Sequence, residues 1–170
     1  RFMSEARAAA QLTHPNIATV YTCEPEGENL FIAMELIEGN TLADALRNHE
    51  VTANQALVYM EQIAQGLRAA HTKNVVHRDI KPGNLMINEE NQIKIMDFGL
   101  AFITEEDPIT NEGVTVGTAA YMSPEQTRGT EVDHRSDIWS FGIVCYEMFS
   151  GNLPFNAPYE QAMIYSILHE

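Results

Sequence analysis

Basic residues and cysteines are scarce in this chain of 170 residues. Ten Lys and Arg residues stand against 24 Asp and Glu residues, which gives a formal net charge of −14 at pH 7. Phosphate backbones and anionic lipids attract clustered Lys and Arg side chains, so neither a nucleic-acid partner nor a membrane contact within this segment is expected. The two cysteines, Cys23 and Cys145, lie far apart and form no disulfide framework, which favours a reducing, cytoplasmic compartment.

Long apolar runs and metal-binding spacings are also lacking. No apolar run reaches the length that crosses a bilayer, and no signal peptide opens the chain. A membrane anchor elsewhere in the parent protein stays compatible with this sequence. The six histidines show no spacing typical of a metal site. What remains is a globular domain, and 170 residues suffice for one sizeable core.

Two short motifs carry the chemistry of the chain: HRDIKPGN at residues 77–84 and DFG at residues 97–99. Together they supply two carboxylates, a carboxamide and a lysine, which are Asp79, Asp97, Asn84 and Lys81. Transfer of a γ-phosphoryl group requires mainly positioning and charge neutralisation, because the transition state is loose and its charge lies on oxygen atoms. This set of groups therefore predicts phosphoryl transfer.

Each of these groups has a predicted role in the reaction. Asp79 would accept the proton of the substrate hydroxyl group. Asp97 and Asn84 offer a carboxylate and an amide oxygen, the hard ligands that Mg²⁺ or Mn²⁺ prefers. Lys81, two residues beyond the base, would reach a γ-phosphate oxygen as a compact point charge.

The residue pattern predicts a mixture of helices and short strands. Thr41 and Thr52 each open a capping box and so predict helix starts, whereas Glu38-Gly39-Asn40 predicts a break. A short hairpin between the two motifs is expected to carry Asn84 into one strand and Asp97 out of the other. The other predicted elements are a helix at 1–12, strands at 17–24 and 30–36, hairpin strands at 85–87 and 92–96, a polar loop at 100–122, and helices near 124, at 136–149 and from 158.

At these motifs the chain resembles the eukaryotic-type (Hanks-type) protein kinases, and most closely the serine/threonine kinases of bacteria. Lys81 favours Ser and Thr over Tyr as acceptor, because tyrosine kinases usually carry alanine or arginine in that stretch. The resemblance covers nearly all 170 residues and includes DIWSFG at residues 137–142. It implies an α+β, two-lobed protein-kinase-like fold, with ATP, Mg²⁺ or Mn²⁺ and a protein substrate as partners.

The resemblance also implies how the nucleotide is held. Glu5 looks like the ion-pairing glutamate of the first large helix of the family. Met34 would be the gatekeeper, while the Glu35 carbonyl and the Ile37 amide would face the adenine. Met86 would form the apolar floor beneath the base.

The resemblance further implies regulatory and substrate-binding residues. Thr110 and Thr115 are the expected autophosphorylation sites, and Arg78 would anchor the phosphate that one of them carries. Thr118 would instead hydrogen-bond the catalytic aspartate and lysine. Glu125 belongs to the Ser-Pro-Glu segment at residues 123–125 beside the protein substrate, and its usual partner is an arginine later in the family's large lobe, past residue 170.

Two further residues have structural roles in the family. His77 serves as a packed, hydrogen-bonded core residue there. Asp137 lies near a helix start, where its charge suits the helix dipole, and by resemblance it also holds the backbone of the catalytic loop, which is the motif at residues 77–84.

The pattern departs from the family at its start. None of the ten glycines forms a Gly-x-Gly, and no lysine is placed to pair with Glu5. The simplest interpretation is a truncated catalytic domain at residues 1–170. It comprises a small-lobe remnant of one helix and two strands (1–36) and most of a mainly helical large lobe (37–170), incomplete at its C-terminal end. Such a fragment is expected to be inactive alone.

Three functions remain open at this point. The first is a fragment of an active serine/threonine protein kinase. Dimerisation of the parent protein for autophosphorylation is compatible with this function. The second is a pseudokinase or scaffold, against which the complete set of catalytic side chains argues. The third is a small-molecule phosphotransferase of the aminoglycoside or choline kinase type, but those enzymes lack the segment around Thr118 and residues 123–125.

Overall fold

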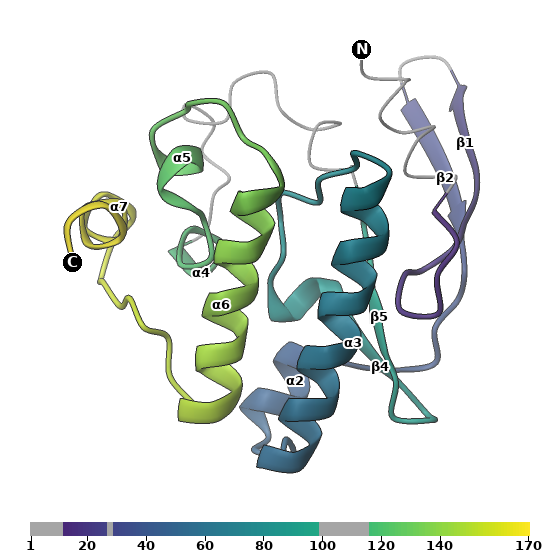
Figure 1. The fold of residues 1–170 in the computed structure, drawn as a ribbon, viewed down its shortest axis with the longest axis horizontal. Coiled ribbons are helices and arrows are strands. Elements are labelled where there is room, and N and C mark those ends of the chain that lie inside the picture. Colours follow the sequence, from purple (N-terminus) through teal and green to yellow (C-terminus); the bar gives the residue numbers. More distant parts are fainter. Residues whose placement is uncertain (1–11, 27–28, 99–115) are drawn as a thin grey trace.

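Two small antiparallel sheets and two long helices form the framework of the chain (Figure 1). The computed structural model describes residues 12–26, 29–98 and 116–170. Residues 1–11 of the helix predicted over 1–12 and most of the predicted polar loop at 100–122 lie outside this part. The mixed α and β composition confirms the predicted fold class.

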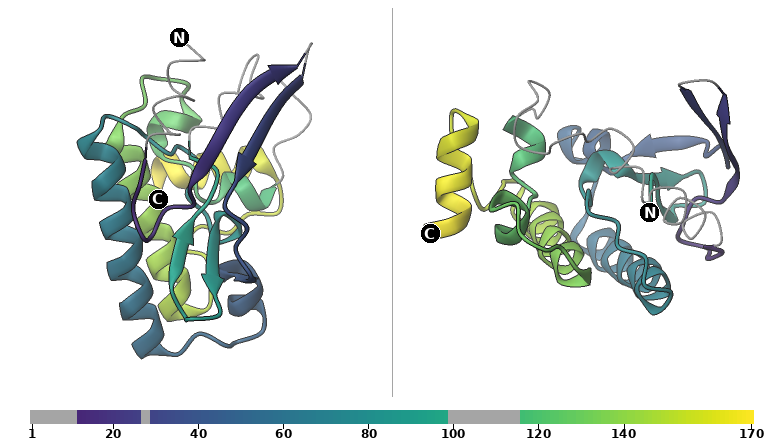
Figure 2. Two further views of the ribbon diagram at one scale, coloured as in Figure 1. Left: turned by 90° about the vertical axis from the view of Figure 1, so that its right-hand side faces the viewer. Right: turned by 90° about the horizontal axis from the view of Figure 1, so that it is seen from above.

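The first sheet is a hairpin of β1 (Val20–Glu26) and β2 (Asn29–Met34), in which Val20 lies opposite Met34. It extends from one end of the molecule, as the two further views in Figure 2 show. Both strands were predicted, with bounds that differ by one to three residues, as is usual for element ends.

The second sheet has the strand order β3-β4-β5 and contains β3 (Gly39–Thr41), β4 (Leu85–Asn88) and β5 (Ile93–Ile95). The β4–β5 hairpin confirms the prediction. The prediction of a break at 38–40 is wrong for Gly39 and Asn40, because these residues pair with β4 across a long sequence separation. Local sequence cannot reveal such pairing.

Helices α2 (Leu42–Arg47) and α3 (Ala53–Thr72) begin at the caps that the sequence predicted. The Thr41 side chain accepts a hydrogen bond from the Asp44 amide, and Thr52 forms a complete capping box with Gln55. A short 3₁₀ turn, η1 (Pro82–Asn84), leads into β4.

The later helices are α4 (Val116–Ala119), α5 (Pro124–Thr127), α6 (His134–Ser150) and α7 (Glu160–His169). The last three confirm the predicted helices. The prediction that the loop continues to residue 122 is wrong for residues 116–119, which form α4. This helix packs against α7, which is distant in the sequence, so local sequence patterns do not predict the contact.

The main core forms where α3 packs against both α6 and β5 (Figure 1). Its fully buried side chains include Ile63, Leu85, Ile93, Ile95 and Val144. A smaller core joins α4 to α7 through buried alanine and aliphatic side chains. Among the described residues, no helix combines the length and the apolar character needed to cross a membrane.

Gly39 provides a test of the β3–β4 contact. Its φ is +151°, and a Cβ atom added there would lie 1.9 Å from the Ile87 carbonyl oxygen. We expect Gly39→Ala to lower the free energy of unfolding by about 1–3 kcal/mol. Alanine is strained at this φ, and its Cβ atom would force β3 and β4 apart. Urea denaturation measures this loss.

Gly142 of α6 is the matched control for this substitution, since an added Cβ there meets no atom within 4 Å. Gly142→Ala should leave stability unchanged or raise it by up to about 1 kcal/mol through helix propensity. Equal effects of the two substitutions would contradict the close approach of β3 to β4.

Candidate active site

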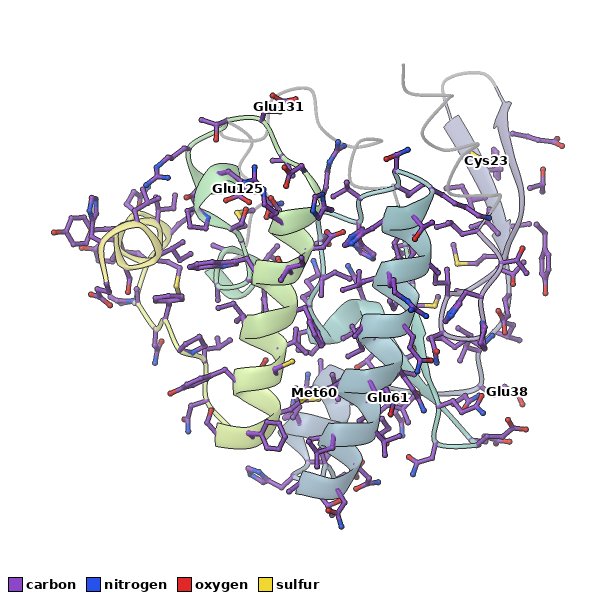
Figure 3. All side chains as sticks on the ribbon, viewed as in Figure 1. Cys23, Glu38, Met60, Glu61, Glu125 and Glu131 are labelled. Carbon is purple, nitrogen blue, oxygen red and sulfur yellow. The ribbon has the colours of Figure 1, made fainter. Side chains whose placement is uncertain are left out.

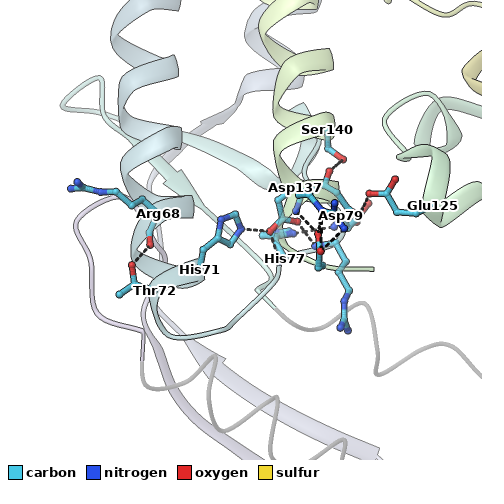
Figure 4. A network of polar contacts seen from close by, with 12 residues as sticks. Arg68, His71, Thr72, His77, Asp79, Glu125, Asp137 and Ser140 are labelled. Atoms are coloured by element: carbon cyan, nitrogen blue, oxygen red, sulfur yellow. Dashed lines mark hydrogen bonds and ion pairs between the residues drawn. The ribbon is translucent and has the colours of Figure 1, made fainter. Parts of the chain in front are cut away.

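A buried carboxylate on α6 anchors the loop that follows α3. Asp137 has no exposed surface, and its oxygens accept hydrogen bonds from the backbone amides of His77 at 2.9 Å and Arg78 at 2.7 Å. His71 of α3 points toward the same carboxylate, with Nε2 2.7 Å from Oδ2 (Figure 4). A buried carboxylate needs such donors, because an unpaired charge in the interior is very costly. The predicted hold of Asp137 on the catalytic loop is confirmed.

His77 connects this loop to the strand that precedes Asp97. Its Nε2 donates to the Met96 carbonyl at 2.7 Å, and its Nδ1 accepts from the Asp79 amide at 3.2 Å. A carbonyl only accepts and an amide only donates, so the contacts select the neutral Nε2–H tautomer. The ring is buried and meets Phe98 edge to face. His77 is therefore a structural residue, as predicted.

The loop brings three of the predicted catalytic side chains together. Lys81 Nζ lies 2.8 Å from Asp79 Oδ2, and the Asn84 amide nitrogen donates to the same oxygen at 2.9 Å. Asn84 also donates to the Asp79 backbone carbonyl at 2.8 Å. Because its nitrogen serves Asp79, the Asn84 carboxamide oxygen is the atom left for a cation.

The β4–β5 hairpin places Asn84 and Asp97 at the same end of the sheet. Leu85 pairs with Ile95, and the Met96 amide donates to the Asn84 carbonyl at 2.9 Å. Asp97 follows with a left-handed φ of 58°, an unfavourable conformation for a residue with a Cβ. Strain of this kind is common where backbone geometry serves a site.

The segment predicted to face the adenine, residues 34–37, is called the hinge. It is tied to β5 by an ion pair that the sequence did not predict. Glu35 Oε1 lies 2.5 Å from Lys94 Nζ, and Glu35 Oε2 accepts from the Thr19 amide at 3.0 Å. Lys94 in turn lies opposite Met86 in the sheet. The ion pair therefore brings the segment after β2 close to Met86.

Charge and burial act in opposite directions on Glu35. Burial disfavours its charged form and raises its pKa, but hydrogen bonds from Lys94 and the Thr19 backbone outweigh burial, so the pKa of Glu35 lies below its ordinary value. Met34 and Ile37, also predicted to contact adenine, are half-buried on either side of Glu35. Their contacts to a nucleotide stay predictions.

The predicted substrate segment lies against the start of α6. Glu125 of α5 accepts a hydrogen bond from the Ser136 hydroxyl, and Figure 3 shows it on the side of α5 that faces α6. Burial raises the pKa of Glu125, but the Ser136 hydrogen bond and its neighbours outweigh this, so the net shift is downward. The neutral Ser136 hydroxyl is thus a hydrogen-bond donor to the Glu125 carboxylate. The sequence predicted only an arginine past residue 170 as its partner.

The remaining predicted residues are placed as follows. Thr118 lies in α4, and its hydrogen bonds to the catalytic aspartate and lysine stay a prediction. Arg78 lies in the catalytic loop with a left-handed φ of 71°. Glu5, Thr110 and Thr115 lie outside the described residues.

Among the described residues that the structure joins to the site, several were not predicted from the sequence, including His71, Lys94 and Gln126. His71 contacts Asp137, Lys94 contacts Glu35, and the Gln126 amide nitrogen donates to the Arg78 carbonyl at 2.7 Å. Each contact spans more than forty positions of the sequence, so no local pattern signals it.

Comparison with known proteins gives one family over the whole chain. A sequence model described as "Protein kinase domain" matches residues 1–170. A probable serine/threonine-protein kinase of Clostridium acetobutylicum is 43% identical over 158 residues, which cover 92% of this chain and 24% of the relative.

Two mycobacterial proteins are similarly related. Serine/threonine-protein kinase PknA of Mycobacterium tuberculosis is 41% identical over 91% of this chain and 37% of its own length. Serine/threonine-protein kinase PknL of the same species is 40% identical over 99% of this chain and 42% of its own length. The chain thus spans about a quarter to two fifths of the length of these curated relatives.

The anchoring role of Asp137 can be tested by its removal. Asp137→Ala leaves the two backbone amides and His71 without an acceptor in the interior, so we expect unfolding free energy to fall by about 3–5 kcal/mol. Asp133 is the partly exposed N-cap of the same helix, and Asp133→Ala should cost only about 0.5–2 kcal/mol. Urea denaturation compares the two, and a loss at Asp137 no larger than at Asp133 would contradict the anchor.

The Glu35–Lys94 ion pair makes stability depend on pH. A carboxylate whose pKa falls on folding stabilises the protein above its ordinary pKa of 4.5, and the effect is lost as pH falls through its folded-state pKa. We expect Glu35→Gln to be less stable than the wild type at neutral pH, with a difference that narrows below about pH 5. Denaturation at a series of pH values measures this difference.

Glu38 is the control for this pH dependence, because it is exposed and lies, like Glu35, in the segment between β2 and β3 (Figure 3). Glu38→Gln should follow the wild-type profile throughout. A stability difference between Glu35→Gln and wild type that is the same at every pH would refute the ion pair as its source.

Proposed function

Because the chain belongs to the protein kinase domain family, we propose that it carries catalytic machinery of an ATP-dependent serine/threonine protein kinase. The observation that supports this most strongly is the cluster of Asp79, Lys81 and Asn84 at the end of the hairpin that leads to Asp97. Relatives at about 40% identity are named serine/threonine-protein kinases.

Asp79 acts on the acceptor in this proposal. Its carboxylate orients the serine or threonine hydroxyl group and receives its proton as the phosphoryl group is transferred. The Asn84 amide and Lys81 hold that carboxylate in place, which limits the reorganisation needed during the reaction. When the substrates bind, the Lys81 side chain moves so that its ammonium group lies near the γ-phosphate oxygens.

Asp97 and the Asn84 carboxamide oxygen would hold Mg²⁺ or Mn²⁺. One carboxylate and one amide oxygen suit a hard cation that keeps water and phosphate oxygens as its other ligands. When bound, the cation neutralises charge on the phosphates. In the same proposal, Glu5 takes the role of the family's ion-pairing glutamate.

The adenine is assigned to the hinge. The Glu35 carbonyl and Ile37 amide would recognise the base, while Met34 and Met86 supply apolar contacts. The Glu35 side chain is occupied by Lys94 and Thr19, so only its backbone is assigned to the nucleotide.

The wider assignments follow from the same proposal. Residues 1–36 would belong to the small lobe and residues 37–170 to the large lobe. Protein substrates would meet Thr118 and Glu125, and phosphate on Thr110 or Thr115 would bind Arg78. Dimerisation of the parent would allow autophosphorylation, and the scarcity of cysteine supports a cytoplasmic setting for this segment.

The assigned roles of the two aspartates can be separated in the full-length parent protein. Asp79→Asn and Asp97→Asn should each lower phosphate transfer from ATP to a basic protein by at least about 100-fold. Only Asp97→Asn should weaken magnesium-dependent nucleotide binding, because Asp79 contacts the acceptor. Transfer of labelled phosphate and titration with a fluorescent ATP analogue, with and without Mg²⁺, measure the two effects.

Glu90→Gln in the exposed β4–β5 turn is the control and should leave both measurements unchanged. Equal binding losses in Asp79→Asn and Asp97→Asn would refute the division of roles. A parent protein that binds nucleotide but transfers no phosphate would favour the pseudokinase or scaffold.

A further inference from the structure

Gln126 makes two kinds of contact with one side chain. It is the third residue of α5, where its Oε1 accepts from the Ser123 amide at 3.0 Å and completes a capping box. Its Nε2 points the other way and donates to the Arg78 carbonyl at 2.7 Å. The capping box needs only the oxygen, so the amide nitrogen is available for the catalytic loop.

The carbonyl that Gln126 holds belongs to the peptide group immediately before the proposed base. The oxygen of this group is that of Arg78, and its N–H is that of Asp79, which donates to His77 Nδ1 at 3.2 Å. Both polar atoms of this peptide therefore have partners, and its plane is fixed.

Arg78 requires this support because its φ of 71° is unfavourable for a residue with a Cβ. Asp137 holds its amide at 2.7 Å, and Gln126 holds its carbonyl at 2.7 Å. The first contact comes from the buried anchor in α6. The second comes from the segment that the proposed function assigns to the protein substrate.

We propose that Gln126 is a positioning residue for phosphoryl transfer, whose amide couples placement of the substrate segment to the orientation of Asp79. This rests on the kinase function proposed above. When α5 is docked, the Arg78–Asp79 peptide is held and the carboxylate faces the acceptor hydroxyl group. When α5 moves away, the left-handed Arg78 loses one of its two backbone contacts, and Asp79 is less well oriented.

Two substitutions in the full-length protein test the donor itself. Gln126→Glu keeps an oxygen for the Ser123 amide, and Glu is an ordinary capping-box residue, but it has no N–H for the Arg78 carbonyl. Gln126→Met lacks both the donor and the cap acceptor, and adds no charge. We expect both to lower kcat for a protein substrate by about tenfold, while KM for ATP and Mg²⁺–ATP affinity change by less than about twofold.

Thr127→Val is the matched control in the same short helix. It removes the hydrogen bond from the Thr127 hydroxyl to the Pro124 carbonyl but no contact to the catalytic loop. Its kcat should stay within about twofold of the wild type, although it also weakens α5. Melting temperatures of all three variants show whether each is folded.

The outcomes separate this proposal from its alternatives. A reduced kcat in Gln126→Met but not in Gln126→Glu would overturn it, because the cap alone would matter. A reduced kcat in Gln126→Glu but not in Gln126→Met would assign the effect to the new charge and also overturn it. An equal loss in Thr127→Val would show a merely structural role for α5. A wild-type protein that transfers no phosphate would instead refute the proposed kinase function.

Discussion

The buried carboxylate of Asp137 is the interaction on which the site depends. It lies in the first turn of α6 without exposed surface, and it accepts from two successive backbone amides while contacting His71 of α3. A carboxylate in this place is tolerated only because these donors replace water. The two long helices and the catalytic loop are therefore joined at one point, and if either helix or the loop moved away, the buried carboxylate would lose hydrogen-bond partners.

The rest of the site is built outward from this anchor through hydrogen bonds and an ion pair. Through its ring, His77 carries the constraint to Met96 and so to Asp97. On the other side, Asn84 and Lys81 hold the Asp79 carboxylate. Arg78 and Asp97 both have left-handed backbone conformations. Hydrogen bonds to Asp137 and Gln126 hold the Arg78 backbone in this conformation. The hydrogen bonds that anchor the loop thus also hold its strained backbone in place.

Much of this arrangement could be predicted from sequence because local chemistry determines it. Thr41, Thr52 and the hairpin residues specify their elements through caps and alternation, and the spacing of Asp79, Asn84 and Asp97 specifies their chemistry. The strand pairing of Gly39 and the helix at 116–119 were not predictable, because each depends on a distant neighbour. The same reason hides Lys94 and Gln126, whose side chains look like ordinary polar residues until the chain is folded.

Hydrogen exchange of the backbone amides of His77 and Arg78 tests the central anchor most directly. If Asp137 accepts both amides in the interior, these two should exchange about as slowly as the amide of Val144 in the core of α6. The Glu89 amide, in the exposed β4–β5 turn, should exchange rapidly under the same conditions. Exchange of His77 and Arg78 as fast as that of Glu89 would contradict the anchor and, with it, the account of how the site is held.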